Sequence, residues 1–172
     1  MNHDLKWELL AIGIAAGIAL IILIPAFLYA RTQARDHLRV EDITNLKQAV
    51  EVYHNDREYY PTPPKSKPHC TDSRTVDSWF FGPQSPIVKG QYIDVSPHDI
   101  RESDTQYYRY CVTDIRKGEA KGYFFEASLE LPQNDVIAFD EDETRKFDYR
   151  ILHEDDKALY RVCGGTETQC RN

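Results

Sequence analysis

The sequence predicts an α+β fold, in which a long N-terminal helix packs on a small antiparallel β-sheet. Residues 9–30 are almost wholly apolar. Residues 31–57 contain no glycine or proline and place apolar side chains mostly three or four positions apart, which is the spacing of one helix face. After residue 106 the apolar period changes to two, as expected for strands with one buried face.

The apolar run predicts a membrane-inserted helix within an N-terminal segment, residues 1–30. From Leu9 to Tyr29 this helix would extend about 31 Å, which matches a hydrocarbon core of roughly 30 Å. A cleavable secretory signal is the alternative, but residues 28–30 (Leu-Tyr-Ala) fit poorly the pattern of small residues that cleavage requires. Pro25 removes one backbone hydrogen bond, so a kink or local loosening is expected near residues 21–22.

The helix is expected to continue as an amphipathic segment over residues 31–60. Charged residues occupy most of its circumference, and one stripe is apolar. The stripe consists of Ala34, Leu38, Ile43, Leu46, Val50 and Tyr53. An apolar stripe on an otherwise charged helix predicts burial of that face against another element.

Residues 61–172 form the predicted globular domain. The stretch YYPTPPKSKPHC ends the helix and starts a proline-rich loop. The irregular region that follows, residues 62–106, offers apolar packing contacts at Trp79, Phe80, Phe81, Ile87, Val88, Tyr92, Ile93 and Val95. Strands are predicted at 106–112, 122–131, 147–152 and 158–163, with HEDDK as a hairpin turn between the last two. The apolar stripe of the helix is expected to cover the buried face of this sheet, and the other face of the sheet is expected to be exposed to solvent.

The four cysteines, Cys70, Cys111, Cys163 and Cys170, all follow the apolar segment. Their even number in a polar domain behind a membrane helix predicts disulfides and an oxidising compartment. Three pairings are possible. The short loop through two glycines favours Cys163–Cys170 and leaves Cys70–Cys111, whereas four free thiols are the alternative.

Composition and motifs argue against several functions. The net charge of −7 disfavours nucleic-acid binding by the domain as a whole. The histidines show no ligand spacing, and no nucleophile–base motif or phosphate loop appears, so neither an enzyme nor a cofactor is expected. Residues 140–143 (Asp-Glu-Asp-Glu) could bind Ca²⁺, but they lack EF-hand spacing and a solvated turn is the favoured interpretation.

Three stretches together resemble the type IV pilin family, including the pseudopilins of type II secretion. ELLAIGIAAGIALIILIPAFLYARTQAR resembles the family's N-terminal helix, and the interval of 17 residues from Glu8 to Pro25 is the family's interval. RDHLRVEDITNLKQAVEVYHNDREYYPT is similar to the pseudopilin helix end, and IVKGQYIDVSPHD to a segment before the sheet. The likeness covers residues 5–64 well and 85–131 loosely.

The resemblance implies a pilin-like fold and a structural subunit of a type IV pilus-like or pseudopilus filament. Its partners would be identical or related pilin subunits, the inner membrane and a filament assembly platform. The implied assembly residues are Glu8, which would pair with a positive group of a neighbour, and Pro25, which would let the helix unwind locally. Gly13 and Gly17 would allow close helix approach. The alternatives are a Glu8 in the headgroup region and a Pro25 that is merely tolerated.

Two features leave a second hypothesis open. Where the family has a glycine before its cleavage site, this sequence has His3. Arg31, Arg35 and Arg39 follow the apolar segment and by counting would keep the domain in the cytoplasm, whereas the cysteines and the resemblance place it outside. The alternative is therefore an unprocessed or minor single-pass membrane protein whose extracytoplasmic domain binds a ligand or partner.

Overall fold

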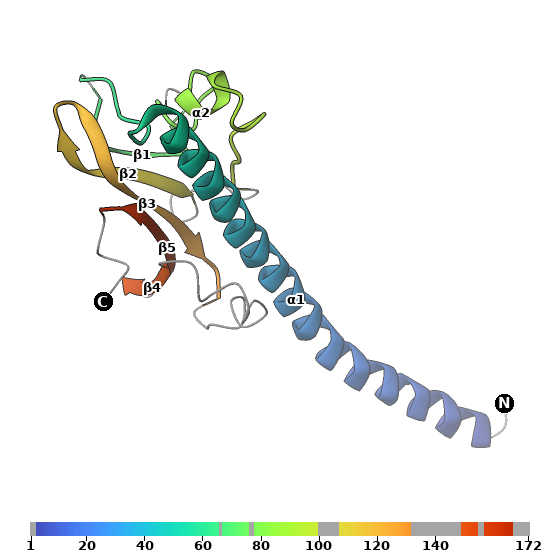
Figure 1. Cartoon of the computed structure of the whole chain (residues 1–172). Coiled ribbons are helices and arrows are strands. Elements are labelled where there is room, and N and C mark those ends of the chain that lie inside the picture. The colour runs from blue at the N-terminus through green and yellow to red at the C-terminus, as the bar shows by residue number, and fades with distance from the viewer. Residues whose placement is uncertain are drawn as a thin grey trace.

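The computed structural model describes residues 3–65, 67–75, 78–99, 107–131, 149–154 and 157–166. Along the chain it contains α1 (His3–Arg57), β1 (Cys70–Asp72), α2 (Pro86–Lys89), β2 (Tyr108–Arg116), β3 (Glu119–Leu129), β4 (Tyr149–Glu154) and β5 (Lys157–Gly165). The long helix extends well beyond the sheet on which its second half lies (Figure 1). The predicted α+β arrangement is confirmed.

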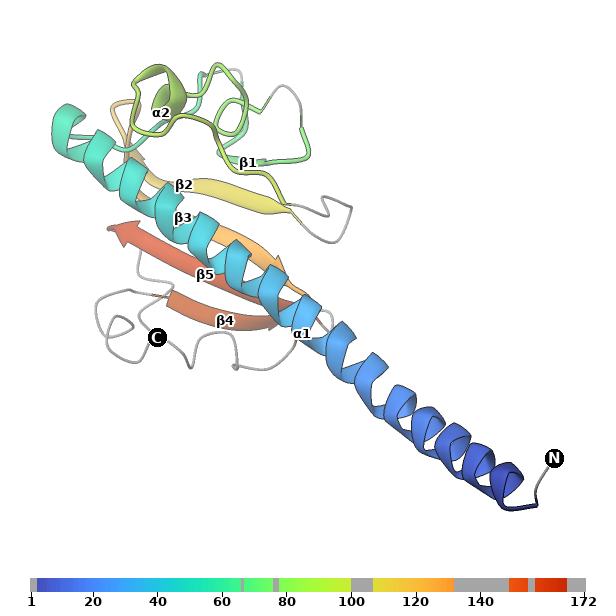
Figure 2. The same cartoon turned by 90° about the vertical axis from the view of Figure 1, so that its right-hand side faces the viewer.

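Helix α1 is continuous over 55 residues and includes Pro25. The loosening expected near residues 21–22 does not appear as a break in the helix. The second half of α1 crosses β2, β3 and β5 (Figure 2), and there Ile43, Leu46 and Val50 are fully buried. The sequence therefore identified correctly the part of the stripe that covers the sheet.

The first part of the predicted stripe is wrong. Ala34 is exposed, and the Leu38 side chain keeps 44 % of its surface accessible. Asp36 and Arg39 are buried in their place. The buried positions of the described helix are 36, 39, 43, 46, 49, 50 and 53, and without Ala49 they alternate steps of three and four. Two charged residues continue the buried face because the sheet edge and a loop supply partners for them.

The sheet has five strands in the order β1-β2-β3-β5-β4, and all neighbours are antiparallel. The four predicted strands are present, with boundaries shifted by a few residues. Strand β1 was not predicted, because three residues reading CTD show no recognisable period. The predicted hairpin joins β4 to β5, although residues 155–156 of its turn lie outside the described residues.

Strand β3 places Tyr123, Phe125, Ala127 and Leu129 in the core beneath α1, as its alternation predicts. The opposite face of the sheet was expected to be exposed to solvent, and the structure corrects this expectation in part. Glu126 on that face is only 4 % exposed. Its carboxylate accepts from Arg109 Nη1 at 3.2 Å and from Arg161 Nε at 2.8 Å, so the neighbouring strands neutralise it.

An aromatic cluster fills the space between α1, the sheet and the loop of residues 78–99. Phe80 stacks on Tyr110 with ring centroids 3.9 Å apart, and Trp79, Phe81 and Ile87 are also buried. Most of the packing residues predicted in this irregular region contribute to the core. Val95 is the exception, since it is 74 % exposed.

The predicted disulfide between Cys70 and Cys111 is confirmed. It joins directly opposed residues of β1 and β2, whose Cα atoms lie 4.1 Å apart. Cys163 is also disulfide-bonded. Its predicted partner, Cys170, lies outside the described residues. The alternative of free thiols is therefore wrong for these three described cysteines.

Candidate assembly surface and its junction with the domain

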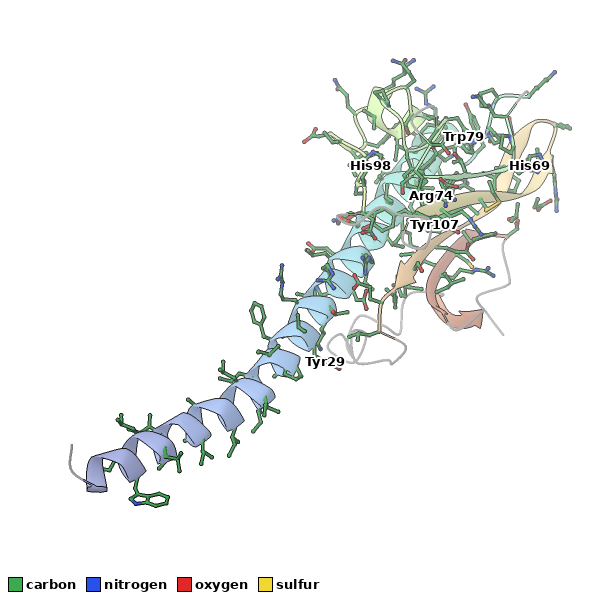
Figure 3. The ribbon with its side chains drawn as sticks, turned by 180° about the vertical axis from the view of Figure 1, so that it is seen from behind. Tyr29, His69, Arg74, Trp79, His98 and Tyr107 are labelled. Carbon is green, nitrogen blue, oxygen red and sulfur yellow. A yellow bond between two sulfur atoms is a disulfide. The ribbon has the colours of Figure 1, made fainter. Side chains whose placement is uncertain are left out.

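The first half of α1 is a continuous exposed apolar surface. We call residues 7–29 the assembly surface. Its large side chains project all around the helix (Figure 3), and Ile21, for example, is 73 % exposed. The large exposed side chains are Trp7, Leu9, Leu10, Ile12, Ile14, Ile18, Leu20, Ile21, Ile22, Leu23, Ile24, Phe27, Leu28 and Tyr29. A helix that is apolar on every face belongs in lipid or among other helices.

The length and composition of α1 suffice to cross a membrane near the N-terminus of the chain. The 18-residue window that meets this criterion has none of its residues buried inside the structure. The globular part therefore covers no portion of that window. Its apolar surface must be removed from water by lipid, by detergent or by another protein.

The four sequence-predicted assembly residues all lie on this part of α1. Glu8 is exposed near its start and Pro25 lies inside the helix near its end. Gly13 and Gly17 are one turn apart, and a Cβ atom added at either position would meet no atom within 4 Å. The structure thus leaves open space beside both glycines. Within a single chain Glu8 and Pro25 are separated by about 25 Å of helix.

A buried ion-pair network lies where the assembly surface meets the globular domain. We call it the junction network. Arg39 donates from Nε to Asp99 at 2.5 Å and from Nη1 to Asp36 at 2.6 Å, and its Nη2 lies 2.9 Å from Glu130 Oε1. Arg35 donates to both oxygens of Glu130, at 2.7 and 2.6 Å. Two guanidinium groups of α1 thereby bind the loop before β2 and the residue after β3.

Asp36 contributes a second kind of contact to the junction network. Its carboxylate accepts the backbone N–H groups of Glu130 at 3.0 Å and of Leu131 at 2.9 Å. These two groups follow the last residue of β3 and have no ladder partner there. A helix side chain thus provides acceptors for the backbone N–H groups at the end of a strand, and this contact fixes α1 relative to the sheet.

The network favours the charged forms of Arg39 and Glu130 despite their burial. Desolvation alone would lower the pKa of Arg39, but the hydrogen bonds and charges of Asp99, Asp36 and Glu130 outweigh it and raise that pKa. The pKa of Glu130 is lowered to about 2, mainly by the hydrogen bond from Arg35, with a further contribution from Arg39. Paired charges of this kind are costly to separate, because one would remain buried without its partner.

Farther along α1, acidic side chains accept hydrogen bonds from tyrosines of the sheet. Asp42 accepts from the Tyr108 hydroxyl at 2.6 Å, and Glu51 accepts from the Tyr123 hydroxyl at 2.6 Å. Burial raises the pKa of Tyr108 above its ordinary value, and the Asp42 carboxylate raises it further. These tyrosines therefore remain protonated donors at physiological pH. The helix is held by polar contacts along its edge as well as by its apolar stripe.

The sequence interpretation named candidate assembly residues, whose role stays a prediction, and it missed the junction network. It considered Arg35 and Arg39 only as charges flanking a membrane segment. A usable signal was present, because positions 36 and 39 continue the spacing of the buried residues 43, 46, 50 and 53. Charged residues in register with an apolar stripe indicate that the packed partner supplies opposite charges.

No group of side chains in the described part of the chain is arranged to hold a metal ion. Residues 140–143, which the sequence analysis weighed as a calcium site, lie outside the described residues. Comparison with known proteins identifies no matching family model, no matching curated protein and no matching solved structure.

Proposed function

We propose that the chain is a structural subunit of a type IV pilus-like or pseudopilus filament and that it assembles through the assembly surface. The observation that supports this most directly is that the two halves of one continuous helix have different surroundings. Residues 7–29 are apolar and exposed on all sides, whereas one face of residues 36–53 is buried on the sheet. A subunit that moves from a bilayer into a bundle of like helices needs such a helix.

In this proposal, assembly transfers the apolar half of α1 from lipid to the helices of neighbouring subunits. Lipid and helix surfaces are similarly apolar, so close packing and polar pairing would provide most of the selectivity. The open space beside Gly13 and Gly17 would admit a neighbouring backbone. Glu8 would pair with a positive group of a neighbour, because a lone carboxylate in hydrocarbon costs about 2.5–3.5 kcal/mol.

The junction network would have a mechanical role in the same proposal. A filament requires every subunit to hold its globular domain in one orientation on the helix. Arg39 and Asp36 bind both the loop before β2 and the end of β3, so they would resist rotation of the domain about α1. The domain would then face outward, in the periplasm or at the cell surface, while the monomer remains anchored in the inner membrane.

The proposal is tested by substituting the assembly surface in the intact chain. Sheared surface material and the membrane fraction from cells producing each variant are compared by immunoblotting and by electron microscopy of filaments. We expect Glu8→Ala to reduce filament-associated protein at least fivefold and Gly13→Leu to reduce it further. Glu41→Gln, which changes an exposed carboxylate on the covered half of α1, is the matched control and should assemble normally.

Two outcomes would contradict the proposal. One is a chain that remains monomeric in the membrane fraction under all conditions and never appears in sheared material. That result would favour the single-pass protein whose outer domain binds a ligand or partner. The other is normal assembly of the Glu8→Ala and Gly13→Leu variants, which would remove the role of these residues.

A further inference from the structure

A pocket of about 520 Å³ lies beside the proline-rich loop of the globular part, away from the assembly surface. We call it the proline pocket. Its walls come from three segments, within residues 62–67, 78–79 and 82–86. Figure 3 shows Trp79, one of its lining residues, in the globular part and far from Tyr29 on the helix. A volume of this size is typical of sites for small ligands.

The walls of the proline pocket are held in place by the fold itself. Pro64, Pro83 and Pro86 line it, and each proline ring fixes one backbone dihedral angle. The indole N–H of Trp79 donates to the backbone oxygen of Pro68 at 3.2 Å, which fixes the ring at the base of the loop. A site that is already ordered loses little conformational entropy when a ligand binds.

Several polar groups of the lining already have partners within the chain. The Thr62 hydroxyl accepts the backbone N–H of Ala120 at 3.0 Å, and the Ser78 hydroxyl accepts the backbone N–H of Phe81 at 3.0 Å. The indole N–H of Trp79 is engaged in the same way. These groups support the walls and are not the ones that would select a ligand.

Lys67 and Gln84 are the polar side chains that remain. Both are exposed, and no hydrogen bond or ion pair joins either side chain to a described residue. Among the described lining residues Lys67 is the only charged one, whereas the lining of a second pocket, between residues 73 and 98, has charges of both signs. Residues 61–69, which supply Lys67, also contain Lys65 and no acidic residue. Asp77, next to one wall, lies outside the described residues. The charge of the described lining favours an anion.

The rest of the lining is apolar, and this restricts the kind of anion. Three proline rings and the edge of Trp79 form a wall without further donors or acceptors in its side chains. A phosphate or another compact anion would leave this wall uncovered. A single carboxylate attached to a branched alkyl or aromatic group would cover the wall and reach the ammonium. The C-terminal residue of a peptide has this form, and so does a free alkyl carboxylic acid.

We propose that the proline pocket binds a carboxylate that carries an apolar group. The carboxylate would accept a hydrogen bond from the Lys67 ammonium, and the apolar group would lie against Pro83, Pro86 and Trp79. In a peptide C-terminus the Gln84 carboxamide would pair with the backbone amide next to the carboxylate. The site does not rest on the proposed filament function, since none of its described lining residues belongs to α1.

The test uses the full isotope-labelled chain in non-ionic detergent micelles and two-dimensional NMR. The chain has two tryptophans, so the indole N–H resonance of Trp79 reports on the pocket and that of Trp7 reports on probe that enters the micelle. Nα-acetyl-leucine is the peptide-like probe, and isocaproate is the same alkyl carboxylate without the amide. We expect saturable shifts at Trp79, and the tighter probe identifies the source. Absence of a saturable Trp79 shift with both carboxylates would overturn the proposal.

Two further compounds separate the contributions of the charge and of the apolar group. Nα-acetyl-leucinamide has no carboxylate and should bind at least about tenfold more weakly than Nα-acetyl-leucine, because the charge-assisted hydrogen bond is lost. Nα-acetyl-glycine keeps the carboxylate without the alkyl group and should bind at least about fivefold more weakly, because less apolar surface is buried. Equal binding of either compound would contradict the assigned chemistry.

Lys67→Gln tests the ammonium directly. The side chain is exposed and has no described partner, so the variant should fold normally and bind both carboxylates about tenfold more weakly. Lys117→Gln removes the same charge from an exposed residue between β2 and β3, outside the described lining, and should leave the affinities unchanged. A Lys67→Gln variant that binds as tightly as the original chain would overturn the proposal.

Gln84→Ala tests the contact with the peptide amide. The affinity for Nα-acetyl-leucine should fall about threefold, because one neutral hydrogen bond is lost, whereas the affinity for isocaproate should stay the same. An unchanged affinity for Nα-acetyl-leucine would overturn the pairing assigned to Gln84. An equal loss for both probes would show that the carboxamide contacts the carboxylate instead, against the arrangement proposed here.

Discussion

The two halves of α1 share one backbone and differ in almost everything else. Residues 7–29 expose apolar side chains on every side, whereas residues 36–53 bury one regular face and expose the rest. The buried face begins with Asp36 and Arg39 and continues with aliphatic residues. The covered half has its partner in the same chain, whereas the exposed half has none among the described residues.

This difference separates two kinds of stability. Substitutions in the covered half should change the free energy of unfolding of the globular domain. Substitutions in the exposed half should leave that quantity unchanged and act only on membrane insertion or assembly. Each of the following measurements uses the full chain in detergent micelles, with urea unfolding followed by near-ultraviolet circular dichroism.

The largest effect is expected for Arg39→Met. The substitution removes the guanidinium that Asp36 and Asp99 share, and leaves two buried carboxylates without it. We expect a loss of about 3–5 kcal/mol in the free energy of unfolding. Arg116→Met is the control, because Arg116 forms an exposed pair with Asp114 and should matter little. Equal effects of the two variants would show that the junction network does not hold the helix on the sheet.

Leu46→Ala compares the two halves directly. Leu46 is fully buried between α1 and the sheet, and truncating it should cost about 2–5 kcal/mol. Ile18→Ala on the assembly surface removes a comparable aliphatic side chain that touches no part of the domain, and should change the free energy of unfolding by less than about 0.5 kcal/mol. A large effect at Ile18 would mean that the exposed half contributes to the domain fold.

The junction network also predicts a pH dependence. The pKa of Glu130 is about 2 in the folded chain, against an ordinary value of 4.5. Since the folded pKa is the lower one, the ionised carboxylate stabilises the fold fully above about pH 4.5, and this stabilisation is lost as the pH falls toward 2. Glu130→Gln should therefore flatten the acid limb of the stability profile. Glu119→Gln, at an exposed residue of β3, should leave that limb as it is.

Within the covered half of α1, a small effect is expected for Leu38→Ala. The alternation of apolar residues placed Leu38 in the buried stripe, but the side chain is 44 % exposed. Its truncation should cost less than about 1 kcal/mol, whereas truncation of the next residue of the predicted stripe, Ile43→Ala, should cost about 2–5 kcal/mol because Ile43 is fully buried. Similar losses at the two positions would restore the stripe that the sequence predicted.

Local patterns explain how much of this fold could be predicted. The long helix, four strands and the inward face of β3 follow from apolar spacing, which depends only on the geometry of each element. The disulfide between Cys70 and Cys111 was chosen by elimination, and the structure agrees. Strand β1 was missed because its three residues acquire their structure from β2 and the disulfide rather than from their own preference.

The candidate site was predictable in part, for the same reason. The assembly surface consists of contiguous residues, so their composition alone marks them. The junction network joins α1 to residues 60 to 95 positions away, and no local pattern indicates such a contact. A pocket of the globular part likewise combines segments between residues 73 and 98, which no local pattern brings together.

The sequence by itself determined that one helix has an apolar half and an amphipathic half, and that an antiparallel sheet follows. Each of these depends on neighbours within a few residues. Only the tertiary structure decided that Asp36 and Arg39 extend the buried face of the helix. It also decided that Glu126 is buried on the sheet face that was expected to be exposed to solvent. The burial of a charge or hydroxyl depends on partners that folding brings from distant positions, whereas the burial of an apolar stripe requires only that something covers it.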